Sequence, residues 1–173
     1  MKDLTTSDIE RQNVLNNRFA VDEMQRQLGI EGMLFEGEYR FTKKMIADFY
    51  GVDISTINRY LDSNGEELKH NGYVLCKGKT LREFKLQFDH LINETSKITQ
   101  LGLFNFRAFL NMGMLLAESE KAKAVRSLIL GMMYAFMAGE DYDEALKLDI
   151  ARATSLGELG VQGEDYDREE SKE

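Results

Sequence analysis

Apolar side chains recur every three or four positions near the start of the chain, a spacing that places them on one face of a helix. The pattern predicts a helix over Thr6–Leu28, with Ser7 and Glu10 as a candidate capping box near its start and Gly29 as its stop. Residues 33–42 then alternate between apolar and polar around Gly37, so we expect a short two-stranded ribbon there.

Two shorter helical patterns follow the ribbon. The first covers Lys43–Tyr50, with Thr42 as its cap and Gly51 as its stop. The second begins after the capping residue Asp53 and extends from Ile54 to about Leu61. We therefore expect two helices joined by a tight turn.

The middle of the chain carries the signals of a β-hairpin. Ser63-Asn64-Gly65 predicts a turn after the second short helix. Tyr73–Cys76 is apolar, Lys77-Gly78-Lys79 suits a tight basic turn, and apolar and polar residues alternate over Phe84–Phe88. These signals predict two antiparallel strands with a basic tip.

The second half of the chain predicts one more strand, at Ile98–Phe104, and two long helices, at Phe106–Ala117 and Ser119–Ala138. Gly139 is expected to end the second of these helices. Leu128–Met137 is apolar on nearly all sides, which favours burial either in the core or against a second copy of the chain.

Charge is distributed unevenly along the chain, and this distribution is more informative than its total of −8. Residues 140–173 hold 12 acidic and 4 basic residues, so residues 1–139 are neutral overall, while residues 39–88 carry a net charge of +3. A partner of the middle region therefore meets a basic surface. The acidic end predicts an amphipathic helix at Asp141–Ala153 and a disordered tail over Gly157–Glu173.

The changes in apolar pattern and in charge divide the chain into three parts. Residues 1–30 form an N-terminal helical segment, and residues 31–139 form the central domain with its packing or dimerisation helices. Residues 140–173 form the acidic helix and tail.

One spacing in the central domain is specific. Residues 43–61 read KKMIADFYGVDISTINRYL, which follows the pattern of a helix-turn-helix. Ala47 is small enough for two helices to cross, Gly51 accepts the positive φ of the turn, and Ile57 faces the first helix. Tyr60 is bulkier than the aliphatic side chain usually found at the next apolar position.

The polar face of the second helix carries side chains that suit DNA. Arginine forks onto guanine and asparagine onto adenine, so Asn58 and Arg59 are candidate base contacts. Ser55 and Thr56 are candidates for phosphate or base contacts. The candidates for contacts with the DNA backbone are the basic residues Lys43, Lys44, Lys77, Lys79 and Arg82. Taken singly, each would be a solvated surface residue, but the Ala-Gly-Ile spacing favours DNA binding.

The same residues carry a family resemblance. Tyr39–Thr42 and the helix-turn-helix after it, with Gly-Val-Asp and Ser-Thr-Ile, resemble the start of bacterial RhuM-type DNA-binding proteins. Gly78–Lys85 is similar to their basic hairpin, and Leu101–Leu130 also resembles the related Bro-N and KilA-N domains of phage antirepressors. In that second half, the matching residues are Asn105, Ala122, Ala124 and Arg126. The resemblance covers about Phe35–Leu130 and implies DNA binding in bacterial or phage regulation.

Other chemistry has little support in the sequence. His70 and His90 lack the spacing of a metal site, and Cys76, without a nearby histidine, is expected to be a buried structural thiol. Glycine spacing does not match a phosphate-binding loop. We therefore expect no catalytic site, no metal and no cofactor. The sequence also lacks a signal-peptide pattern and an apolar run long enough for a membrane span, which points to the cytoplasm and to no membrane partner.

The sequence thus predicts an α+β fold, a winged helix-turn-helix with a small β-hairpin or sheet and additional C-terminal helices. We expect a phage or bacterial regulator that binds double-stranded DNA. A homodimer would place two recognition helices about one turn of DNA apart. The alternative is a protein-interaction adaptor or antirepressor, whose acidic C-terminal region binds a protein partner.

Overall fold

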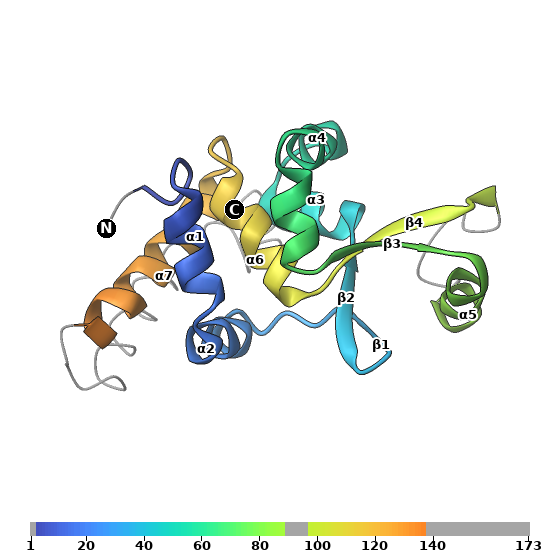
Figure 1. The fold of residues 1–173 in the computed structure, drawn as a ribbon, viewed down its shortest axis with the longest axis horizontal. Coiled ribbons are helices and arrows are strands. Elements are labelled where there is room, and N and C mark those ends of the chain that lie inside the picture. Colours follow the sequence, from blue (N-terminus) through green and yellow to red (C-terminus); the bar gives the residue numbers. More distant parts are fainter. Residues whose placement is uncertain (1–2, 89–96, 138–173) are drawn as a thin grey trace, which may run out of the picture.

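The computed structural model describes residues 3–88 and 97–137 of the chain. Within these ranges the protein forms seven helices and one four-stranded antiparallel sheet (Figure 1). The predicted α+β fold class is therefore confirmed. In the part of the chain that the structure describes, no helix is long and apolar enough to cross a membrane.

The N-terminal segment forms two helices, α1 (Asp8–Leu15) and α2 (Arg18–Leu28). The single helix predicted over Thr6–Leu28 is wrong, because Asn17 starts a new helix in its middle. The Asn17 side chain accepts a hydrogen bond from the backbone N–H of Ala20 at 3.1 Å. This bond satisfies one of the free donors at the start of α2, which makes the break stable.

A β-ribbon and a pair of helices come next. β1 (Met33–Phe35) and β2 (Glu38–Thr42) pair antiparallel, as predicted, and lead into α3 (Lys43–Tyr50) and α4 (Ile54–His70). The predicted caps and stops that the structure confirms are Ser7, Gly29, Thr42, Gly51 and Asp53.

α4 is longer than the sequence predicts. It continues through the turn expected at Ser63–Gly65, and non-helical angles at Asn64 (φ −124°, ψ 27°) mark a kink within it. The backbone thus departs from helical geometry within the predicted turn, but the departure is a kink and the helix continues, because the residues after it are anchored by tertiary contacts. Leu68 is fully buried in the core, and Glu67 forms an ion pair with another helix. Such packing overrides a local preference for a turn.

The largest correction concerns the predicted basic hairpin. Gly78–Phe88 is not a turn and a strand but a helix, α5. Leu81 and Phe84 are buried on one face of this helix, three residues apart, whereas Leu86 is 86% exposed. The buried residues of α5 therefore follow helical spacing and not the alternation that predicted a strand, and the helix is stabilised because its buried face packs on the sheet.

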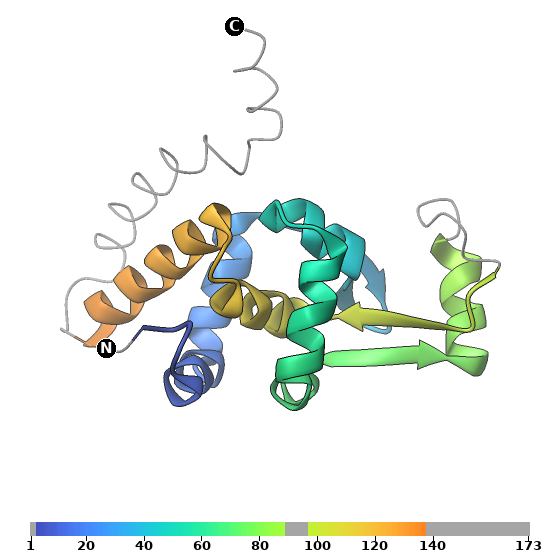
Figure 2. The same ribbon diagram turned by 90° about the horizontal axis from the view of Figure 1, so that it is seen from above.

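The strands have the order β1-β2-β4-β3. β4 (Gln100–Phe104) is the strand predicted at Ile98–Phe104, and it pairs antiparallel with all of β3 (Tyr73–Lys77). β3, α5 and β4 extend away from the other helices, with α5 at the far end (Figures 1 and 2). We refer to residues 73–88 and 97–104 as the arm.

Within residues 3–88 and 97–137, two hydrophobic clusters hold the fold together. α6 (Phe106–Leu115) lies in the larger cluster, where every one of its side chains except Arg107 is buried. Val14 of α1 and Met24 of α2 belong to the same cluster, so the N-terminal segment packs into the core that supports α3 and α4. The smaller cluster joins β1 to the arm through Met33, Phe35, Cys76, Leu81, Phe84 and Leu103.

α7 (Glu120–Met137) corresponds to the second long helix predicted from the sequence. Its inner side, which includes Ile129 and Met132, is buried in the larger cluster, whereas Tyr134 and Met137 are exposed. The homodimer expected from this apolar helix stays a prediction. The features predicted at Gly139, Asp141–Ala153 and Gly157–Glu173 lie outside the described residues.

Candidate nucleic-acid interface

α3 and α4 meet as the Ala-Gly-Ile spacing requires. Gly51 adopts the left-handed conformation (φ 68°), and the backbone N–H of Val52 donates to the carbonyl oxygen of Ala47 at 3.0 Å. Ala47 of α3 and Ile57 of α4 are both buried in the larger hydrophobic cluster. The chain therefore turns sharply after α3, because only glycine tolerates this φ at low cost.

Tyr50, the last residue of α3, fixes this pair of helices to the core. Its hydroxyl donates to the carbonyl oxygen of Phe109 at 3.1 Å, and its own carbonyl accepts a bond from the Ser119 hydroxyl at 2.7 Å. Gly113 makes room for the ring, since a Cβ at Gly113 would lie 2.3 Å from the Tyr50 hydroxyl. Burial raises the pKa of Tyr50, so the hydroxyl keeps its proton for this bond.

A polar stripe runs along the exposed side of the first half of α4. Ser55, Asn58, Arg59 and Asp62 are exposed there at helical spacing, whereas Thr56 is half-buried. We refer to these four exposed residues as the α4 stripe. The structure thus places three of the four predicted recognition residues on the surface, opposite the buried Ile57.

Ser55 already has a role within the protein. Asp53 caps α4 by accepting bonds from the Ser55 backbone N–H at 2.9 Å and from the Ser55 hydroxyl at 2.7 Å. These bonds lower the pKa of Asp53, which keeps a negative charge at the start of α4. The negative charge of Asp53 therefore disfavours a phosphate at the start of α4, although the peptide dipoles of the helix N-terminus favour one.

Arg59 is held by two neighbours. Its Nη2 forms an ion pair with Glu118 in the loop between α6 and α7, and its Cζ lies 4.9 Å from the ring centroid of Tyr60. The Tyr60 hydroxyl donates to the same carboxylate at 2.7 Å. The bond from Tyr60 and the contact with Arg59 together lower the pKa of Glu118, so the carboxylate stays charged. Sequence reasoning missed Glu118, because it lies 59 positions from Arg59.

The two lysines at the start of α3 differ in their surroundings. Lys44 is exposed and forms an ion pair with Asp48 one turn along the helix, at 3.1 Å. Lys43 is half-buried next to the capping residue Thr42. An exposed pair of this kind is weak, so Lys44 remains able to contact an anion.

The remaining basic candidates lie on the arm. Lys77 ends β3, and Lys79 and Arg82 lie one turn apart near the start of α5, all three exposed. Lys85, in contrast, donates to the carbonyl oxygen of Ile98 at 2.9 Å and thereby ties α5 to the chain before β4. Both views place α5 at the end of the arm, well away from α4 (Figures 1 and 2). The candidates therefore form two separate patches.

Cys76 is buried in the smaller hydrophobic cluster, and this burial raises the pKa of its thiol, as expected for a structural cysteine. Among residues 3–88 and 97–137, His, Cys, Asp and Glu do not form a cluster that could hold a metal ion.

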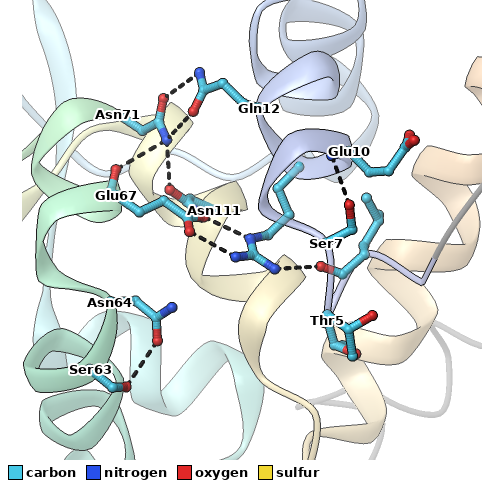
Figure 3. Close-up of polar contacts among 12 residues, drawn as sticks. Thr5, Ser7, Glu10, Gln12, Ser63, Asn64, Glu67, Asn71 and Asn111 are labelled. Carbon is cyan, nitrogen blue, oxygen red and sulfur yellow. Dashed lines mark hydrogen bonds and ion pairs between the residues drawn. The ribbon is translucent and has the colours of Figure 1, made fainter.

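A largely buried polar network, which sequence reasoning missed, joins α4 to α1 and α6 (Figure 3). Glu67 of α4 accepts two bonds from Arg11 of α1, at 2.7 and 2.8 Å, and one from Asn111 of α6, at 2.6 Å. Asn71, after α4, joins the same network by donating to Asn111 at 2.8 Å and to Gln12 at 3.0 Å. Three helices are thereby fixed to one another around the second half of α4.

A broad groove of about 1080 Å³ lies between α2 and the β1–β2 ribbon. Basic and acidic side chains alternate along it, including Arg18, Asp22, Arg26 and Glu31. Because the charges are mixed, the groove does not favour an anion or a cation, and we assign it no ligand.

Comparison of the chain with models of known protein families, with curated proteins and with solved structures gives no match. The resemblance to RhuM-type and antirepressor domains therefore rests on the residues named above.

Proposed function

We propose that the protein is a double-stranded DNA-binding regulator of phage or bacterial type. In this proposal, α3 and α4 form the helix-turn-helix, and α4 enters the major groove with its exposed stripe. The arm takes the place of the wing and contacts the phosphate backbone through Lys77, Lys79 and Arg82. A cytoplasmic homodimer, with one copy on each half of a DNA site, completes the proposal.

The observation that carries the proposal is the junction at Gly51. A left-handed glycine, a buried Ala47 four residues before it and a buried Ile57 six residues after it support a helix-turn-helix. The exposed Asn58 can donate one bond to adenine and accept another from it, and the exposed Arg59 can donate two bonds to guanine. The net charge of +3 over residues 39–88 supports a polyanionic partner, and so does the resemblance to RhuM-type proteins.

Binding to duplex DNA at two salt concentrations tests the proposal. We expect the protein to bind a pool of labelled duplexes with a randomised centre, and to bind more weakly at about 200 mM than at about 50 mM salt. If all five basic candidates contact phosphates, the slope of log affinity against log salt is about −4.5 for one copy, since each contact contributes about 0.9.

The alternative function gives a different result in the same experiment. An adaptor that acts through its acidic C-terminal region on a protein partner predicts no salt-sensitive binding to DNA. Absence of binding at both salt concentrations, with a folded protein, would therefore rule out the DNA-binding proposal.

A further inference from the structure

The contacts around Arg59 carry an inference that rests on the proposed function and goes beyond it. The carboxylate of Glu118 binds two groups of α4, with one oxygen on Arg59 Nη2 and the other on the Tyr60 hydroxyl. The guanidinium also lies over the Tyr60 ring. A side chain that is free to swing on most helix surfaces is thus guided by a carboxylate and an aromatic ring.

The loop that presents Glu118 is itself anchored. Its neighbour Ser119 is buried and donates to the carbonyl oxygen of Tyr50 at 2.7 Å. Arg126, which is 9% exposed, donates to the carbonyl oxygen of Leu116 at 2.9 Å. Because the loop is fixed on both sides of Glu118, the carboxylate stays beside α4.

A carboxylate in this place changes what an arginine can bind. The ion pair uses one of the five N–H donors of the guanidinium, so donors remain for a two-point contact with guanine. A phosphate, in contrast, would bring a second negative charge to the same guanidinium and meet repulsion from Glu118. The arrangement therefore favours a base edge over the backbone as the partner of Arg59.

We propose that Glu118 is a specificity-determining residue of the DNA interface, which holds Arg59 for a base and keeps it from the phosphate backbone. In the free protein the pair is exposed to water and contributes little to stability. When DNA covers the pair, water leaves and the interaction strengthens, so its effect falls on the choice between DNA sequences.

The experiment compares two duplexes. One is selected from a randomised pool by the wild-type protein, and the other has the same composition in scrambled order. For Glu118→Gln we expect tighter binding to the scrambled duplex, with a salt slope steeper by about 0.9, because the released Arg59 takes a phosphate. We expect the ratio of the two affinities to fall about tenfold, which corresponds to one bidentate base contact.

Two further variants separate this role from a general effect of charge. Glu120→Gln removes the same charge two residues further along, at an exposed position in the first turn of α7, and is expected to leave the ratio unchanged. In an Arg59→Ala background, Glu118→Gln is expected to have no further effect on the ratio. Thermal melting checks that each variant is folded.

Each outcome has a distinct meaning. If the wild-type protein selects a duplex but Glu118→Gln behaves like Glu120→Gln, the inference about Glu118 is wrong and the proposed function stands. If Glu118→Gln still lowers the ratio when Arg59 is absent, Glu118 does not act through Arg59, and the inference is again overturned. If the wild-type protein binds no duplex, the proposed function itself fails.

Discussion

Arg11 on α1 and Glu67 on α4 form a two-point ion pair across 56 positions of sequence, with N–O distances of 2.7 and 2.8 Å. Arg11 is 5% exposed, and its remaining nitrogen, Nη1, donates to the carbonyl oxygen of Leu4 at 2.7 Å. The N-terminal segment is thereby joined to the helix that we propose reads DNA. The Arg11–Glu67 ion pair therefore links the stability of the fold to the position of α4.

We predict that Arg11→Ala lowers the free energy of unfolding at pH 7 by about 3 kcal/mol, because it leaves a largely buried carboxylate without its charged partner. Urea unfolding measures this loss. The matched control is Lys44→Ala, which breaks the exposed pair with Asp48 and is expected to cost less than about 1 kcal/mol. Equal losses in the two variants would show that the buried pair contributes no more than a surface pair.

The same pair predicts how stability depends on pH. Burial by itself raises the pKa of Glu67, but hydrogen bonds from Arg11 and Asn111 outweigh burial and hold the pKa below its ordinary value of 4.5. A carboxylate with a lowered pKa in the folded state contributes its full stabilisation at pH values above its ordinary pKa. This stabilisation is lost as the pH falls through the pKa of the folded state. We therefore expect the stability difference between wild type and Glu67→Gln to be constant near neutral pH. It should shrink below about pH 4.5, as measured by urea unfolding across that range.

Gly51 allows a test of the turn between α3 and α4. A Cβ at this position meets no atom within 4 Å, so the cost of Gly51→Ala comes from its left-handed φ of 68° alone. We expect a loss of about 1–2 kcal/mol in the free energy of unfolding. Gly65→Ala is the matched control, because Gly65 also has open space but lies within α4. Alanine at position 65 should stabilise α4 by about 0.5–1 kcal/mol. Losses of the same size in both variants would contradict the left-handed conformation of Gly51.

The sequence predicted those parts of the fold whose signals are local. The caps at Thr42 and Asp53 and the stop at Gly51 depend on neighbouring residues only, so the start and end of α3 and the start of α4 could be placed correctly. Prediction was wrong where distant contacts decide the structure. α4 continues past the kink at Asn64 because Leu68 beyond it is buried. α5 is a helix because Phe84 packs edge-on against Phe35 of β1, with ring centroids 5.0 Å apart.

The candidate site likewise contains some residues that the sequence could predict and others that it could not. The polar face with Asn58 and Arg59 could be derived from helical periodicity, and the structure exposes both residues. Glu118 could not be derived, because its place beside Arg59 depends on how α6 and α7 pack on α3. The predicted position of Lys79 and Arg82 on a hairpin was wrong, yet both remain exposed, since the sheet-facing side of α5 is formed by other residues.

We predict that Asn58→Ala and Arg59→Ala each reduce discrimination between the selected and the scrambled duplex by about 1–3 kcal/mol, the range for loss of a bidentate base contact. Glu66→Ala is a suitable comparison, because it truncates an exposed residue of α4 that lies outside the α4 stripe. Fluorescence anisotropy with the wild type, the two variants and the control on both duplexes gives the eight affinities needed. Unchanged discrimination in folded Asn58→Ala and Arg59→Ala proteins would remove α4 as the recognition helix.

The last prediction concerns the arm, whose corrected structure changes the test. On a hairpin tip, Lys77 and Lys79 would act together, whereas on α5 the exposed neighbours are Lys79 and Arg82, one helical turn apart. If both contact phosphates, the double variant Lys79→Ala/Arg82→Ala weakens binding to any duplex and reduces the salt slope by about 1.8, since each lost contact contributes about 0.9. Discrimination between duplexes should stay the same, because phosphate contacts do not depend on base sequence.

The control for this variant must remove the same charge elsewhere. Lys69→Ala/Lys123→Ala does so at exposed positions in the last turn of α4 and on α7. Charge removal alone lowers affinity slightly through the long-range field, and salt screens this effect because the Debye length is about 10 Å at 0.1 M. Direct contacts differ in that they release condensed counterions and change the slope itself. If the two double variants show the same slope, the arm does not bind the backbone, and the proposed wing loses its role.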